Sequence, residues 1–187
     1  MASGDEAWIE TGRRDLADYG IFKASERTRR GPHGKSGRFI VLDAPEWAVV
    51  VPVLERSGRR LILAVRQFRH GSQTASTEFP GGLVEPGEAP AAAAARELLE
   101  ETGYSAGRIV ELGSCNPNPA FMANTFHVFA ATDLSLVAEQ SLDEHEIVEV
   151  EEIPEDELWA RVGNPPWSHA LMVTAAWYYR RWREEGR

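Results

Sequence analysis

The sequence predicts an α/β protein of the α+β kind, in which a mixed central sheet is sandwiched between helices and preceded by a β-rich N-terminal extension. Three segments rich in Val, Ile and Phe come before any convincing helix. An alanine-rich helix then separates them from further strands, and a second helix closes the chain. Strands on both sides of a central helix favour an αβα sandwich.

The predicted strands are bounded by residues typical of turns. Ala44-Pro45 and Ser57-Gly58 separate the first three, and Asn116–Ala120 is a proline-punctuated loop between two later ones. Upstream, Tyr19–Thr28 is predicted as a short strand or an irregular arm, and the basic segment 29–36 as a turn or mobile loop. The predicted strands are Gly37–Leu42, Trp47–Leu54, Arg60–Arg69, Arg108–Ser114, Thr125–Ala131 and Ile147–Ile153.

Two helices are predicted from their sequence boundaries and patterning. Ala89–Thr102 has Pro90 near its start and Gly103 just past its end, which is the usual helix asymmetry. Ser168–Arg183 is the second helix, with Ser168 as its cap. Its predicted core stripe consists of Ala170, Leu171, Thr174, Trp177 and Tyr178.

The composition suits one well-cored domain with an extension, since the chain has 187 residues and 43% hydrophobic content. We place the extension at residues 1–45 and the main domain at residues 46–187. The first residues lack the basic-then-apolar order of a secretory signal, and the longest apolar stretches are too short to cross a bilayer. No membrane partner is therefore expected.

Net charge and cysteine content exclude several kinds of partner and site. The formal net charge of −9 argues against broad attachment to nucleic acid or anionic lipid, so no nucleic-acid partner is expected. Cys115 is the single cysteine, so the chain has no intramolecular disulfide and no cysteine-based zinc site. This pattern predicts a cytoplasmic protein.

Three glutamates crowd one side of the alanine-rich helix. Glu97 lies three residues before Glu100 and four before Glu101, so their carboxylates project from neighbouring positions. Each like-charged pair costs about 0.2–0.5 kcal/mol in an isolated helix, which favours a compensating cation. Hard ions such as Mg²⁺ bind through carboxylates and suit phosphate chemistry. The alternative is an ordinary solvated stripe in which Arg96 pairs along the helix.

The surrounding spacing decides between these interpretations. Gly82 is followed after five residues by Glu88 and after seven more by Arg96-Glu97-Leu98-Leu99-Glu100-Glu101-Thr102-Gly103-Tyr104. This pattern resembles the conserved box of the Nudix hydrolase family, with every fixed position present and an aromatic at Tyr104 where an aliphatic is more usual. The match covers 23 of the 187 residues.

The resemblance implies a loop–helix–loop that binds Mg²⁺, with Mn²⁺ as an alternative. Glu97 and Glu101 would ligate the ion, joined by the backbone carbonyl of Gly81. Glu100 would assist as ligand or base, and Arg96 would orient the carboxylates. Glu88 is expected to pin the loop rather than touch substrate.

Segments outside the box resemble the subgroup that hydrolyses ADP-ribose and related nucleotide sugars. These segments are Arg66-Gln67-Phe68-Arg69 and Glu78-Phe79-Pro80-Gly81-Gly82. Pro119, 16 residues beyond Gly103, resembles that subgroup's specificity proline. The stretch Asn116–Ala120 departs from the simpler Ser-Pro-Gly form, so GDP-mannose and other nucleotide sugars stay open, as does a plain structural turn.

The acidic stretch Asp143-Glu144-His145-Glu146 resembles the loop that supplies the subgroup's catalytic base. A mobile carboxylate of this kind deprotonates the attacking water once substrate is bound. Glu146 is the first candidate for this base and Glu144 the second, and Glu146 is also expected to reach the metal. The alternative is an exposed acidic hairpin tip, and His145 is expected to be solvent-exposed.

The remaining substrate contacts are predicted from residue type. Trp47 and Phe79 are candidates to stack on a purine, although Trp47 is more often a core residue. The planar donor fork of Arg69 suits a phosphate or the distal ribose. Glu78 and Pro119 complete the predicted substrate-binding set, and His127 is expected to pack rather than react.

Together these expectations describe an enzyme that hydrolyses the pyrophosphate bond of nucleoside diphosphate-linked small molecules, giving a nucleoside monophosphate and a sugar phosphate. Two alternatives remain: a Nudix enzyme acting on dinucleoside polyphosphates or nucleoside triphosphates, and a nucleotide-binding module without catalysis. In the resembling subgroup the extension is exchanged between subunits, which predicts a homodimer. Trp8, Ile9 and Ile21 in an otherwise polar arm agree with docking.

Overall fold

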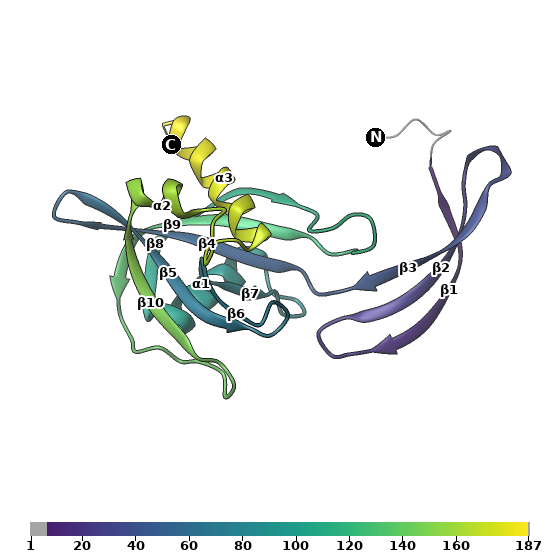
Figure 1. Ribbon diagram of the computed structural model, residues 1–187, viewed down its shortest axis with the longest axis horizontal. Coiled ribbons are helices and arrows are strands. Elements are labelled where there is room, and N and C mark those ends of the chain that lie inside the picture. The colour runs from purple at the N-terminus through teal and green to yellow at the C-terminus, as the bar shows by residue number, and fades with distance from the viewer. Residues whose placement is uncertain (1–6, 187) are drawn as a thin grey trace. The chain divides into compact units, whose positions relative to one another are not determined.

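The computed structural model describes residues 7–186, so residues 1–6 of the predicted extension lie outside the described residues. The chain divides into two compact units. The first runs to Pro45 and also contains Asn116–Thr125, and the second contains Glu46–Cys115 and Phe126–Arg187. Figure 1 shows the ribbon of both.

The first unit is built on a three-stranded antiparallel sheet of β1 (Ile9–Asp18), β2 (Lys23–Arg30) and β3 (Ser36–Asp43), in that order. Figure 1 shows these strands in purple and blue. Arg29 and Arg30 therefore belong to β2, and Pro32–Gly34 forms a short 3-10 turn. The prediction of a loop over all of 29–36 is wrong at its ends, because the β2–β3 ladder extends to the pair Arg30 and Ser36.

The second unit contains a seven-stranded sheet. Its main path is β10, β5, β4, β9 and β8, while β6 pairs with β5 and β7 with β4. Their bounds are β4 Trp47–Arg56, β5 Arg59–Arg69, β6 Thr74–Glu78, β7 Gly81–Leu83, β8 Tyr104–Cys115, β9 Phe126–Leu136 and β10 Val148–Pro154. The β4–β9 pair is parallel and the others are antiparallel, which confirms the predicted mixed sheet.

Strand β4 shows how two helices cover opposite faces of this sheet. Its residues Val49, Val51 and Val53 belong to one core cluster, which also contains buried residues of α3 (Ala170–Glu184). Its residues Ala48 and Val50 belong to a second cluster, with buried residues of α1 (Pro90–Thr102). Because successive strand side chains point to opposite faces, α1 and α3 lie on the two sides of the sheet, and the αβα sandwich is confirmed.

The closing helix differs from its prediction in both start and buried face. It begins at Ala170 after His169, and no side chain caps it, so the cap predicted at Ser168 is wrong. Its buried residues are Met172, Ala175, Ala176 and Tyr179. The predicted stripe fails most clearly at Trp177, which is 53% exposed beneath the guanidinium of Arg181. Small alanines let the helix pack closely on the sheet and leave the bulky indole outside.

A short helix, α2 (Glu155–Arg161), follows β10 and buries Leu158. Sequence reasoning missed it because seven residues are too few to display a helical period. Within residues 7–186, no helix combines the length and apolar character needed to span a bilayer.

Candidate functional site

Helix α1 carries the predicted box glutamates, and its ends fix where they lie. Pro90 occupies the first turn, and Gly103 closes the helix in the left-handed region at φ 74°, donating its N–H to the carbonyl of Leu99. A Cβ at Gly103 would overlap the carbonyl oxygen of Ala138. Glycine is therefore required both by the backbone conformation and by the neighbouring chain.

Glu101 is the most deeply buried of the three glutamates, with 3% exposure. Its Oε2 accepts a hydrogen bond of 3.1 Å from the backbone N–H of Gly81 at the start of β7. Burial and then the negative charge of Glu97 raise the pKa of Glu101 to about 8. A carboxyl group in this position gains from any cation that enters beside it.

Glu97 lies against the glycine turn that precedes the helix. A Cβ added to Gly82 would overlap the Glu97 carboxylate, so the close approach depends on glycine. Burial raises the pKa of Glu97 against the opposing effect of Arg96, and the charges of Glu100 and Glu146 raise it further. The pKa of Glu97 is thus raised mainly by its burial, and the neighbouring carboxylates add to that effect.

Arg96 ties the loop to the helix. Its Nε and Nη2 donate to the two carboxylate oxygens of Glu88 at 3.0 and 3.1 Å. Its Nη1 donates to Glu97 at 2.9 Å and to Glu100 at 3.1 Å. Glu88 in turn accepts the N–H of Glu85 at 3.0 Å. These contacts agree with the expected pinning role of Glu88 and orienting role of Arg96.

The loop that contains the acidic residues 143–146 begins beside the C-terminal end of α1. Ser141 N–H donates to the carbonyl of Glu100 at 2.9 Å, and the amide of Gln140 donates to the carbonyl of Glu101. Glu146 is close enough for its charge to raise the pKa of Glu97 and of Glu101. Glu144 and Glu146 are both exposed, and Glu146 is the loop carboxylate whose charge reaches Glu97 and Glu101. His145 is exposed as predicted.

The donor set fits a hard divalent cation. Glu97 and Glu101 offer carboxylate oxygens, and burial raises the pKa of each, with further contributions from the charges of Glu100 and Glu146 on Glu97 and of Glu97 and Glu146 on Glu101. Within residues 7–186, no three His, Cys, Asp or Glu side chains are already gathered as a metal-binding group. Two of the box carboxylates, those of Glu97 and Glu100, instead accept hydrogen bonds from Arg96 Nη1.

Arg69 and Glu78 form a second cluster, from the ends of β5 and β6. Arg69 Nε and Nη2 donate to the two oxygens of Glu78 at 2.9 and 2.7 Å. Burial alone would raise the pKa of Glu78, but contacts with His169 and Arg69 outweigh it and lower the pKa to about 2. Glu78 is 1% exposed, so it holds Arg69 rather than offering a free carboxylate to substrate.

The predicted stacking residues are placed differently from expectation. Phe79 is 2% exposed and packs edge-on against Trp167, with ring centroids 5.4 Å apart. Trp47 is half-buried against the same core cluster. The proposed purine platform is therefore wrong for Phe79 and unsupported for Trp47, because both rings pack into the apolar core. His127 Nε2 lies 2.9 Å from the Glu46 carboxylate oxygen Oε2.

Pro119 belongs to the first unit, in the segment Asn116–Thr125. It is exposed and lies in a turn where the Asn118 carbonyl accepts the N–H groups of Phe121 and Met122. Pro119 thus lies in a turn, which is compatible with both interpretations of this proline. Its substrate-binding role stays a prediction.

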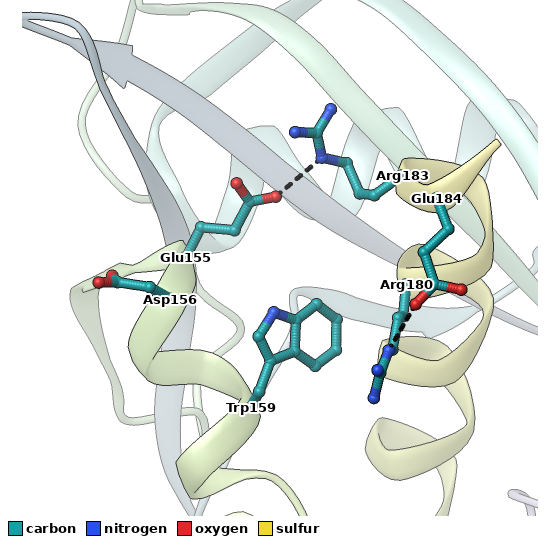
Figure 2. A pocket seen from close by; sticks show the side chains of 6 residues that line it. All are labelled: Glu155, Asp156, Trp159, Arg180, Arg183 and Glu184. Atoms are coloured by element: carbon teal, nitrogen blue, oxygen red, sulfur yellow. Dashed lines mark hydrogen bonds and ion pairs between the residues drawn. The ribbon is translucent and has the colours of Figure 1, made fainter. Parts of the chain in front are cut away.

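A separate open pocket lies between α2 and α3, with a volume of about 520 Å³ (Figure 2). Arg183 is paired with Glu155 at 3.0 Å and Arg180 with Glu184 at 2.8 Å. Asp156 and Trp159 complete its lining, which therefore has three carboxylates and two guanidinium groups. With its arginines already paired, this pocket is poorly suited to phosphate, and it contains none of the predicted site residues.

An αβα sandwich with three glutamates on one side of a helix that follows a glycine turn defines a class of proteins, and comparison with known proteins identifies it. Residues 44–172 match the NUDIX domain model. The chain belongs to the Nudix family.

Several relatives are similar over part of the chain. The ADP-ribose pyrophosphatase of Bacillus subtilis (strain 168) is 39% identical over 123 residues, covering 65% of each chain. The ADP-sugar pyrophosphatase of Mus musculus is 41% identical over 88 residues, covering 44% of this chain and 38% of that protein. The matches thus span less than two thirds of these two relatives. A crystal structure of an ADP compounds hydrolase shares the fold, with a TM-score of 0.85, 21% identity, and coverage of 99% of this chain and 98% of that chain.

Proposed function

We propose that this protein hydrolyses the pyrophosphate bond of nucleoside diphosphate-linked small molecules, with ADP-ribose as the first candidate and nucleotide sugars such as GDP-mannose as others. The products would be a nucleoside monophosphate and a sugar phosphate. The observation that carries the proposal is an acidic cluster, with Glu101 buried at its base, within electrostatic reach of an arginine: the charges of Glu101 and Glu146 act on Arg69. The names of the Bacillus subtilis and mouse relatives support the substrate class.

The acidic cluster would hold the divalent cation, Mg²⁺ or Mn²⁺. Its ligands would be Glu97 and Glu101, with the Gly81 carbonyl, Glu100 and Glu146 as further donors. When bound, such an ion offsets phosphate charge and makes a bound water more acidic. Its selection over other ions follows from an all-oxygen donor set.

The protein's own groups divide the remaining tasks. Arg69 binds phosphate or ribose oxygens through the part of its guanidinium that Glu78 leaves free. Glu146 accepts the proton of the attacking water at its carboxylate, and Glu144 is the second candidate for this role. Arg96 keeps Glu97 and Glu100 in place through its hydrogen bonds.

The first unit supports the proposal of a homodimer. Its exposed apolar side chains include Trp8 at 41%, Ile9 at 58% and Ile21 at 66% exposure. Such side chains gain free energy when a second copy covers them. Light scattering after gel filtration tests this, and a monomer at micromolar concentration would contradict it. The single Cys115 agrees with a cytoplasmic location.

The function is tested by incubating the purified protein with ADP-ribose, GDP-mannose, UDP-glucose, diadenosine polyphosphates and nucleoside triphosphates, with and without Mg²⁺. Release of AMP and ribose 5-phosphate from ADP-ribose, only with the cation, supports the proposal. Pyrophosphate released from triphosphates would instead support the alternative enzyme. Binding without turnover of any of these compounds would indicate a non-catalytic module.

A further inference from the structure

The segment just before α3 docks along β6, the strand that carries Glu78. Pro166 accepts the N–H of Thr77 at 3.1 Å, and the sulfur of Met172 accepts the N–H of Phe79 at 3.1 Å. The ring of Trp167 packs on Phe79. Because β6 pairs with β5 on its other side, residues 166–172 cover the edge of the strand that faces away from the sheet.

His169 lies in the middle of this docking segment and contacts Glu78. Its Nδ1 is 3.0 Å from Glu78 Oε2. That nitrogen is buried, and the 3.0 Å approach to Glu78 is a close polar contact without hydrogen-bond geometry, since Nδ1 hydrogen-bonds to no group of the described residues. The same Oε2 accepts Nη2 of Arg69 at 2.7 Å, so the buried carboxylate is held from two sides.

The arrangement leaves one part of Arg69 available. Nε and Nη2 bind Glu78, and the Arg69 side chain is 42% exposed. Burial by itself would lower the pKa of Arg69, but Glu78, Glu101 and Glu146 together raise it, so the guanidinium lies within electrostatic reach of the acidic cluster. The Arg69 guanidinium is held by Glu78 on one side and is open on the other. The open side suits hydrogen bonds to the oxygens of a diphosphate.

We infer that His169 is a positioning residue, which holds the Glu78 carboxylate from the start of α3 and thereby fixes Arg69 for the diphosphate of the substrate. The inference rests on the proposed function, because it gives Arg69 a substrate to bind. When the buried Glu78 carboxylate loses its polar contact with His169, it is free to rotate, and the rotation moves the Arg69 guanidinium that is bound to both of its oxygens. The effect then falls on substrate binding rather than on the chemical step.

The test compares two variants. His169→Leu removes the contact between Nδ1 and Glu78, and His169→Asn places an amide nitrogen where Nδ1 lay. With ADP-ribose and Mg²⁺, His169→Leu is expected to raise KM about tenfold and to change kcat less than about threefold. His169→Asn is expected to recover most of the lost affinity. Trp167→Phe is the matched control, because it loosens the same segment without touching Glu78.

A second measurement does not depend on turnover. The Nε–H signal of Arg69, assigned by its loss in Arg69→Lys, reports the hydrogen bond to Glu78 by ¹⁵N NMR. We expect its exchange with solvent to be at least about tenfold faster in His169→Leu than in the wild type, and near the wild-type rate in His169→Asn and Trp167→Phe.

These measurements separate the two proposals. If the wild type hydrolyses the panel and His169→Leu changes neither KM nor Nε–H exchange, the positioning role is wrong and the proposed function stands. The same conclusion follows if Trp167→Phe reproduces the whole effect. If the wild type hydrolyses none of the compounds, the proposed function fails. The exchange rate then decides alone, with faster exchange supporting the contact chain and unchanged exchange overturning it.

Discussion

Glu101 accepts a hydrogen bond from the backbone N–H of Gly81 across the gap between helix α1 and strand β7, at 3.1 Å. This contact joins the deepest carboxylate of the helix to the turn that precedes it. It supplies one N–H to a group that burial and Glu97 hold at a pKa of about 8. The group is therefore under-compensated, and its substitution is the sharpest test of the site.

Glu101→Gln should lower kcat/KM by about 100- to 1,000-fold, the scale seen when a group that stabilises transition-state charge is lost. The amide keeps the shape of the side chain, so circular dichroism should show an unchanged fold. Retention of full activity would remove Glu101 from the metal set.

Stability without metal should depend on pH through the same residue. The folded pKa of Glu101, about 8, lies above its ordinary value of 4.5. Between these values the folded protein holds a proton that the unfolded chain has lost, so the free energy of unfolding falls as pH rises through this window. We expect Tm in EDTA to drop by about 3–10 °C across it. Glu101→Gln should flatten the decline, and an equally steep decline in that variant would exclude Glu101 as its source.

Gly82→Ala should weaken the response to Mg²⁺ more than it weakens the fold. The added Cβ overlaps the end of the Glu97 side chain, which is flexible and moves aside. We expect the Mg²⁺ concentration for half-maximal activity to rise about tenfold, with a loss of stability below about 1 kcal/mol. Gly71→Ala is the control, since its Cβ meets nothing within 4 Å. Equal effects of both substitutions would argue against the Gly82–Glu97 contact.

The two loop carboxylates should differ in their effect on the chemical step. Glu146→Gln is expected to lower kcat by about 100-fold or more, as when a general base is lost. Glu144→Gln should lower it less than about tenfold, because Glu146 is the loop carboxylate whose charge reaches Glu97 and Glu101. Steady-state rates at saturating Mg²⁺ measure both. The reverse order would make Glu144 the base.

The elements that sequence predicted best are those with local determinants. The helix bearing Glu97 and Glu101 is set by Pro90, Gly103 and a run of alanines, all within the segment itself. The box glutamates then follow from fixed spacing along one helix. The central strands follow from continuous apolar runs, since both faces of the sheet are covered.

Other features depend on contacts between distant segments, and sequence alone left them open. Strand β1 is exposed along nearly its whole length, so it lacks the alternation that marks a strand. Glu78 and Phe79 are neighbours in the motif, yet one joins Arg69 and the other enters the core. The alternation of side chains along a strand predicts that Glu78 and Phe79 point to opposite faces, but it does not predict which of the two faces the substrate. His169 stands 91 positions from Glu78 in the chain, and its only local signal is its place before a helix.

Strand β4 gives alternate side chains to the two cores, so both helical layers rest on the same ten residues. A shift of the β4 register by one residue would move the side chains that now face α3 to the α1 side of the sheet, and the reverse. The packing of the two layers is therefore coupled through β4. A substitution that disturbs the core under α3 should also shift α1, the helix that carries the glutamates. Loss of the magnesium response would thus accompany core substitutions far from any carboxylate.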